Sequence, residues 1–215
     1  MSESDNTAGE GAEEANGARP EQMQATTHAP LTEEYMRSVH VGKLMPLAGP
    51  IQLVDFDPQW PGLFAREAGR VRAVLGERVL LLEHVGSTSV PGLAAKPRID
   101  MLLVVADSAD EPAYVTDMEA ADYVLHIREP EWHEHRLFKG PDTDINLHVF
   151  SQGCSEIERM LLFRDWLRSH PSDRQLYERT KRELARKNWK YGQNYADAKT
   201  AVVEEILARA REGEQ

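Results

Sequence analysis

Cysteine is nearly absent from this 215-residue chain, whose single cysteine is Cys154. One cysteine forms neither an internal disulfide nor a cysteine-based zinc site, and it fits the reducing environment of the cytoplasm. No run of apolar residues approaches the ~18–20 that a membrane-spanning helix needs, and no apolar segment follows a basic start as it does in secretory signals. These absences predict a cytoplasmic protein that neither spans a membrane nor depends on disulfides.

Positive charge is also scarce. The chain has 25 Lys and Arg against 36 Asp and Glu, a formal net charge of −11. This balance argues against duplex nucleic acid as a partner, because binding to phosphate backbones needs a cationic surface. A small or nucleotide-sized ligand stays open, since an acidic protein can still carry local positive charge.

The first 30 residues are rich in Glu, Ala, Gly, Ser and Asn and contain almost no large apolar side chains. Such a segment buries too little surface to offset its ordering entropy, so we expect a disordered acidic tail. Residues 31–48 are interpreted as a transition, with ordered structure beginning near Ile51. The expected division is a tail and linker over 1–47 and one domain over 48–212.

The rest of the chain predicts an α+β fold, with a sheet core over about 51–152 and a helical region over about 155–211. Apolar residues at three- and four-residue spacing predict a helix from Trp60 to near Gly76. The stretch Arg98–Val105 ends in the continuous apolar run Met101–Val105, which is typical of a central buried strand. A short apolar strand is expected at 79–82, with its end at His84. The other expected elements of the sheet core are a helix at 111–121, a strand at 123–127 and an antiparallel hairpin at 134–139 and 144–150. The helices expected after it are 156–170, 172–190 and 195–211.

A small-residue loop rich in hydroxyls follows the strand that ends at His84. It runs through Gly86, Ser87, Thr88 and Ser89. Glycine allows a tight turn, and backbone N–H groups and hydroxyls at such a turn are suited to hold phosphate. The alternative is a plain connection, because short Gly/Ser loops are weak motifs.

Two charged residues follow this loop, Lys96 and Asp100. Asp100 stands at the start of the buried strand, where a carboxylate is costly unless it is paired or binds a cation. It is therefore either a ligand to a cation or a structural ion-pair partner.

The hairpin carries a second set of polar residues. His133 and His135 alternate on one arm, and Asp144, Asn146 and His148 alternate on the other. Imidazoles and carboxylates at every second position suit a divalent metal or a phosphate. A solvated polar face is the ordinary explanation for such a pattern.

The helical region offers Tyr177, Lys181 and Lys199. These residues could line a cleft against the sheet and attract a polyphosphate. Basic residues on helices are more often solvated or paired four residues apart, as Glu178 and Arg182 would be.

The segment from His84 to Asp100 (HVGSTSVPGLAAKPRID), together with EHRLF at 134–138, NLHVF at 146–150 and LFRD at 162–165, resembles the GrpB family of bacterial proteins. The resemblance covers about residues 50–210. It implies a nucleotidyltransferase-like core of the polymerase-β type, in which a Gly-Ser loop holds nucleotide phosphates and acidic residues hold magnesium. Family members also occur fused to dephospho-CoA kinase, which suggests a link to coenzyme A metabolism.

On this template Gly86 and Ser87 match the phosphate loop, and Asp100 matches the first metal carboxylate. The second carboxylate is expected two residues later, where this sequence has Leu102. Nucleotidyl transfer that uses two metal ions needs closely spaced carboxylates to hold both ions. The hairpin residues Asp144 and His148 would then have to complete the site, and a histidine suits a softer ion than magnesium.

The leading hypothesis is a nucleotidyltransferase-fold protein that binds a nucleotide or nucleotide-like cofactor. If it is an enzyme, the expected reaction is transfer of a nucleotidyl group from a nucleoside triphosphate to a small acceptor or protein. The rivals are a non-catalytic module that binds a nucleotide or coenzyme A derivative, and a metal-dependent hydrolase that uses the histidines. The roles expected under the leading hypothesis are phosphate binding by Gly86, Ser87, Thr88 and Ser89, Mg²⁺ or Mn²⁺ binding by Asp100 with Asp144 or His148, charge stabilisation by Lys96 and Arg136, and general base catalysis by His84 or His135.

Overall fold

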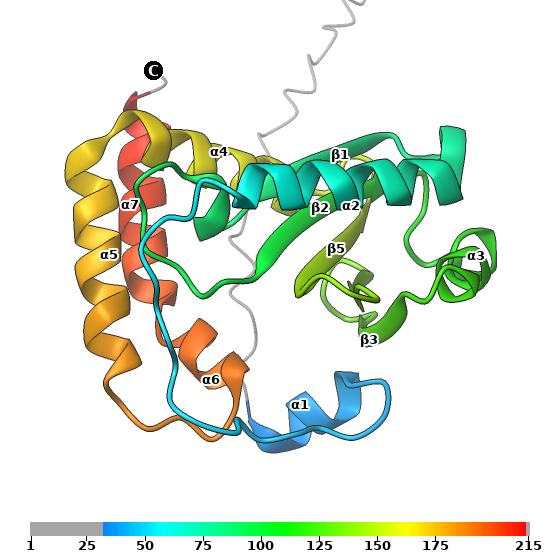
Figure 1. Ribbon diagram of the computed structural model, residues 1–215, viewed down its shortest axis with the longest axis horizontal. Coiled ribbons are helices and arrows are strands. Elements are labelled where there is room, and N and C mark those ends of the chain that lie inside the picture. Colours follow the sequence, from blue (N-terminus) through cyan, green and yellow to red (C-terminus); the bar gives the residue numbers. More distant parts are fainter. Residues whose placement is uncertain (1–31, 214–215) are drawn as a thin grey trace, which may run out of the picture.

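A mixed five-stranded sheet lies at the centre of the computed structural model, which describes residues 32–213 (Figure 1). Its strand order is β1-β2-β5-β4-β3, with β2 and β5 parallel and the other neighbours antiparallel. The strands are β1 (Leu81–Val85), β2 (Ile99–Val105), β3 (Val124–Glu129), β4 (His135–Lys139) and β5 (Ile145–Ser151). The helices are α1 (Glu33–Val39), α2 (Trp60–Leu75), α3 (Val115–Ala120), α4 (Ser155–Ser169), α5 (Pro171–Ala185), α6 (Gly192–Asp197) and α7 (Thr200–Gly213).

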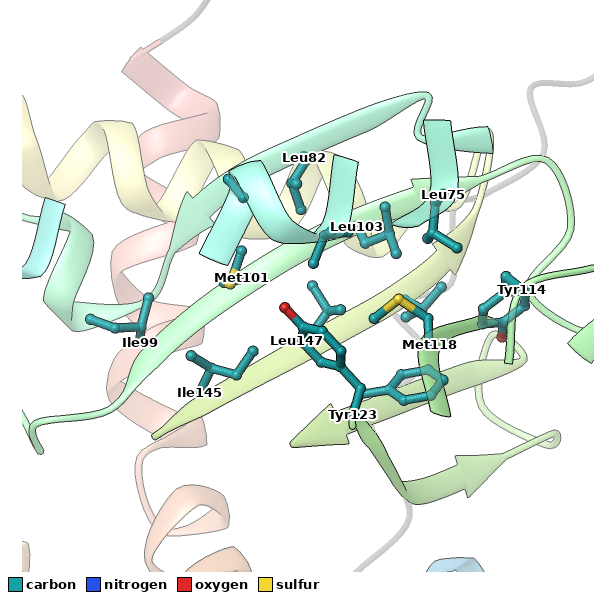
Figure 2. Packing of buried hydrophobic residues seen from close by; sticks show 14 of the residues in the cluster. Leu75, Leu82, Ile99, Met101, Leu103, Tyr114, Met118, Tyr123, Ile145 and Leu147 are labelled. Carbon is teal, nitrogen blue, oxygen red and sulfur yellow. The ribbon is translucent and has the colours of Figure 1, made fainter. Parts of the chain in front are cut away.

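One face of the sheet, which we call the α2 face, packs against α2 and α3 (Figure 2). Met101, Leu103 and Leu147 point to this side from the two central strands, and Leu75 of α2 and Met118 of α3 cover them. Alternate residues of a strand point to opposite faces. Asp100, Leu102 and Asn146 therefore lie on the other face, which we call the α4 face.

The α4 face is covered unevenly. Leu102, Val104 and Phe150 are buried under apolar residues of α4. At the β3 side, Ile127 and Leu137 pack against α1. The row formed by Asp100, Asn146 and Lys139 neighbours the row formed by Leu102, His148 and Leu137, two residues away on each strand.

The C-terminal helices pack against the loop that joins β1 to β2. Val90 and Leu93 of this loop are fully buried in a cluster with residues of α4, α5 and α7. In Figure 1 these helices stand at one end of the sheet, with α6 below them. This packing holds the Gly86–Ser89 turn between the sheet and α5.

The α+β class, the sheet core and the helical C-terminal region are confirmed, as are the helix ending at Gly76, the central strand and the hairpin. The expectation that order begins near Ile51 is wrong. Helix α1 starts at Glu33, is capped by the Thr32 side chain and packs its Val39 against β3. The expected helix at 195–211 is two helices, α6 and α7. The expected disordered tail over residues 1–30 lies outside the described residues.

Among the helices that the structure describes, none is both long and apolar enough to cross a membrane.

Candidate functional site

The turn at Gly86 brings the backbone directly against Asp100. Gly86 has φ +67° and ψ −172°, a conformation open almost only to glycine. A Cβ at this position would lie 2.5 Å from Oδ2 of Asp100. The sequence therefore needs glycine here both for the turn and for the close approach of the turn to the carboxylate.

Asp100 is held in place by its neighbour across the parallel pair. The two residues Asp100 and Asn146 are in register, and Nδ2 of Asn146 donates a hydrogen bond of 2.7 Å to Oδ1 of Asp100. Lys139 on β4 donates in turn to Oδ1 of Asn146. A carboxylate, an amide and an ammonium group thus form a row across three strands.

Within residues 32–213, four lysines lie in the electrostatic field of Asp100. We call this group the lysine cluster; its members are Lys96, Lys139, Lys181 and Lys199. They come from the loop before β2, from β4, from α5 and from the turn between α6 and α7. Burial is the largest cause that lowers the pKa of each lysine, to about 8 for Lys96 and Lys139. The positive charge of Lys199 lowers the pKa of Lys96 further.

Lys181 is the most enclosed member of the cluster, with 2% of its surface exposed. Its Nζ donates to Oγ of Ser87 at 3.0 Å and to the carbonyl oxygen of Ala94, and it lies 4.7 Å from the centre of the Tyr177 ring. Burial and the charge of Lys199 lower the pKa of Lys181 to about 7. At neutral pH this amine is therefore close to half protonated, so a nearby anion would readily return it to the charged form.

Tyr195 of α6 lies between two members of the cluster. The Nζ atoms of Lys96 and Lys199 are 5.3 Å and 5.0 Å from its ring centre. Its hydroxyl is buried and has no hydrogen-bond partner among the described residues. An unsatisfied buried hydroxyl is costly, so it is a group that a bound ligand or water could satisfy.

His84, Thr88 and Ser89 do not join this site. His84 points to the α2 face, where its ring stacks on Phe64 and bonds to Oγ1 of Thr88. Burial lowers the pKa of His84 to about 4. The Ser89 hydroxyl donates to the carbonyl oxygen of Gly86 within the turn. The hydroxyls of Thr88 and Ser89 are thus engaged inside the protein, and Ser87 is the hydroxyl of this loop that faces the lysine cluster.

Arg136 and Asp144 are also paired elsewhere. Arg136 is in register with Val149, whose side chain lies on the α2 face, and it forms ion pairs with Glu111 and Glu134. It therefore lies on the wrong face to stabilise charge at Asp100. Asp144 is exposed and pairs with Arg98 at 2.7 Å, and its charge also acts on Lys96 and Lys139 at the edge of the lysine cluster.

The expected metal set is not assembled. Of the residues described, no group of three or more His, Cys, Asp or Glu is placed to hold a metal ion. Leu102, at the position of the second carboxylate, is fully buried beneath α4. Asp100 is instead surrounded by lysines, which compete with a cation for the carboxylate. This donor set does not fit a pair of magnesium ions.

One histidine from each arm of the hairpin is brought together. His135 and His148 are joined by a hydrogen bond of 3.0 Å from ring to ring, and Nδ1 of His135 lies 2.6 Å from Oε2 of Glu129. His133 lies outside the strand, in the turn that precedes β4.

A cavity of about 490 Å³ lies beside the Gly86–Ser89 turn and is lined by residues of α2, β1 and α4 that include Phe64, His84 and Arg168. No residue of the lysine cluster lines it. Glu83 at this cavity pairs with Arg164, and Arg168 donates to the carbonyl oxygen of Ser89. The charged groups there already have partners, so the lysine cluster is the stronger candidate site.

Sequence reasoning found Gly86, Ser87, Lys96, Asp100 and the helical lysines but missed Lys139, Tyr195 and Glu129. Lys139 had a usable signal, because it alternates with His135 on the strand opposite Asn146. Tyr195 and Glu129 reach the site only through the packing of α6 and β3, for which the sequence carries no local pattern.

Comparison with known proteins places this architecture in a family. The GrpB protein family matches residues 50–209. A UPF0157 protein of Halalkalibacterium halodurans is 59% identical over 191 residues, which cover 89% of this chain and 98% of that protein. The chain belongs to the GrpB family.

The crystal structure of the conserved protein GrpB from Enterococcus faecalis matches this GrpB chain with a TM-score of 0.64 and 30% identity, over 76% of this chain and 99% of that one. A dephospho-CoA kinase of Mycolicibacterium paratuberculosis is 30% identical over 159 residues. That match covers 62% of the GrpB chain but only 39% of the kinase. The expected family and its relation to proteins named dephospho-CoA kinase are therefore confirmed.

Proposed function

We propose that this protein binds the phosphates of a nucleotide or of a coenzyme A-type ligand at the lysine cluster. The observation that carries the proposal is the convergence of four lysines from separate segments on one carboxylate, with Lys181 also bonded to the Ser87 hydroxyl. Like charges held this close repel one another and favour the neutral amines. A bound anion removes that penalty, because it restores the charged form of each lysine.

The half-buried position of the site supports the same proposal. Lys96, Lys139, Lys199 and Asp100 all keep part of their surface exposed, so a ligand can reach them. Electrostatic interactions are stronger at partly buried sites than in open water. The net positive charge of this site thus gives the acidic protein a local preference for anions.

The type of ligand is narrowed by the relatives and by the donor set. Some relatives are named dephospho-CoA kinase, which favours a ligand of the nucleotide or coenzyme A kind. The buried Leu102 and the lysines around Asp100 favour charge neutralisation by ammonium groups over chemistry that needs two metal ions. Any magnesium or manganese would enter together with the phosphates of the ligand.

The proposal is tested by thermal unfolding of the full chain with each common nucleoside triphosphate, coenzyme A and dephospho-CoA, with and without magnesium or manganese. A ligand at 100 times its Kd adds about 2.7 kcal/mol to the free energy of unfolding, which is a readily measured rise in Tm. We expect at least one of these ligands to raise Tm.

Two substitutions locate the binding. Lys181→Met removes a buried member of the cluster and should abolish the rise in Tm. Lys187→Met, an exposed lysine just beyond the end of α5, is the matched control and should leave the rise unchanged. The proposal fails if no ligand in the panel raises Tm, or if both variants respond like the wild type.

A further inference from the structure

A chain of buried hydrogen bonds leads from the β3 edge of the sheet towards the lysine cluster. Oε2 of Glu129 accepts from Nδ1 of His135, and Nε2 of His135 faces Nδ1 of His148. Glu129 and His135 are 7% and 3% exposed. The two imidazole rings are stacked, and His135 also stacks on Phe150. Both rings are therefore fixed in position as well as hydrogen bonded.

The carboxylate at one end of this chain determines where the protons lie. A carboxylate only accepts, so Nδ1 of His135 carries the proton and Nε2 of the neutral ring is an acceptor. Nδ1 of His148 must then donate to that acceptor. The remaining nitrogen, Nε2 of His148, is left without a proton, and it has no hydrogen-bond partner among the described residues.

His148 is the member of this chain nearest to the lysine cluster. It lies on the α4 face in register with Leu102, two residues from Asn146 on the same strand, and it is half-buried. Burial and the neighbouring His135 lower the pKa of His148 to about 4. The ring is thus a neutral base at physiological pH, next to the place where phosphates are proposed to bind.

The charged groups around this chain come from β2, β3, β4 and helix α4. Asp100 and Glu129 raise the proton affinity of His148, and Lys139 and His135 lower it. Glu156 of α4 lies close enough to His135 to interact with it electrostatically, and it is itself paired with Arg159.

We propose that His148 is a general base at the lysine cluster and that Glu129 and His135 are positioning residues that keep its Nε2 free to accept a proton. This inference rests on the proposed phosphate binding. The substrates are a phosphoanhydride and a second molecule with a hydroxyl group, or water. A carboxylate that orients a histidine and stabilises its protonated form is a known arrangement in acid–base catalysis.

The proposed step balances in protons and electrons. The acceptor oxygen forms a bond to phosphorus as its proton passes to Nε2 of His148. The bond between that phosphorus and the bridging oxygen breaks, and its electron pair leaves with the departing phosphate. Glu129 offsets the positive charge that the histidine pair gains, and the lysines stabilise the charge on the phosphates.

The first test reads the protons directly in the free protein. Nitrogen-15 NMR of the histidine rings at pH 7 distinguishes a protonated nitrogen from a bare one. We expect both His135 and His148 to carry the proton on Nδ1, and we expect Glu129→Gln to remove this fixed arrangement at His135. A proton on Nε2 of His148 in the wild type would overturn the proposal, whether or not the variant folds.

The second test uses inorganic pyrophosphate as the probe and counts the protons taken up on binding. Calorimetry at pH 5.5 in two buffers of different ionisation heat gives this number. The wild type should take up more protons than His148→Gln, because bound phosphate raises the proton affinity of His148. The ionisation of pyrophosphate itself cancels in this comparison.

The matched control is His84→Gln, since His84 is also buried and also has a pKa lowered to about 4, but lies on the opposite face of the sheet. It should take up as many protons as the wild type. Equal uptake by the wild type and His148→Gln would overturn the inference. If pyrophosphate fails to bind the wild type, the proposed phosphate binding is what fails, and the NMR result still decides whether the histidine chain exists.

Discussion

Removal of the Lys181 amine should change how the stability of the free protein depends on pH. The ordinary pKa of a lysine is about 10.4, and burial with the charge of Lys199 lowers that of Lys181 to about 7 in the folded protein. Between these two values the unfolded chain binds a proton that the folded protein has released. The free energy of unfolding therefore rises with pH in this window, and the contribution is lost as pH falls towards 7.

The size of the effect follows from the number of protons involved. Where the unfolded chain binds one proton more than the folded protein, the free energy of unfolding rises by about 1.4 kcal/mol per pH unit. Because Lys181 is about half protonated at pH 7 and almost neutral by pH 8, it contributes roughly 2 kcal/mol between pH 7 and pH 9. The Lys181→Met variant lacks this contribution, so its free energy of unfolding should rise less over the same range.

Urea denaturation at pH 7, 8 and 9 measures this difference. Lys96 and Lys139 also have lowered pKa values and contribute to the slope in both proteins, so only the difference between the proteins is attributed to Lys181. Lys187→Met, which changes an exposed lysine, should follow the wild type. Parallel curves for the wild type and Lys181→Met would refute the account of Lys181 as a strained, partly neutral amine.

Substitutions at three further positions test the framework around the site by urea denaturation. Gly86→Ala should lower the free energy of unfolding by about 1–3 kcal/mol from backbone strain alone, and by more because its Cβ would displace Asp100; a loss under about 0.5 kcal/mol would contradict the close approach. Leu102→Asp buries a carboxylate in an apolar cluster and should lower the free energy of unfolding by several kcal/mol. Its control Leu102→Met should lower it by less than about 1.5 kcal/mol. Equal losses of stability in the two variants would contradict the burial of Leu102. Tyr123→Phe removes a 3.0 Å hydrogen bond to the buried Glu67 and should cost about 1.5–3 kcal/mol, and a neutral result would show that Glu67 does not need this donor.

Much of the fold follows from local patterns in the sequence. The spacing of Trp60 to Leu75 and the glycine that follows define α2, and the apolar run from Ile99 defines β2. Helix α1 was missed because it is only seven residues long and its stability depends on packing against β3. The break between α6 and α7 likewise has no proline or glycine to mark it.

The site was only partly predictable, because the sequence shows which residues alternate but not which face is covered. Gly86, Ser87 and Asp100 were identified correctly as neighbours. His84 was placed wrongly because the turn at Gly86 follows a strand whose alternation sends His84 to the α2 face. Arg136 alternates with His135 along β4 and so lies on the α2 face, where the expected charge stabilisation at Asp100 does not fit. The lysine cluster draws on four distant segments, and only their packing brings the charges together.

Binding of inorganic pyrophosphate is the most direct test of the lysine cluster as a phosphate site. Calorimetric titration of the full chain at low and at moderate salt should show binding that weakens as salt rises, that is lost in Lys181→Met, and that persists in Lys187→Met. Pyrophosphate carries no base or sugar, so binding of this probe isolates the phosphate contacts. Absence of binding in the wild type, or equal binding by Lys181→Met, would contradict the assignment of the lysine cluster as a phosphate site.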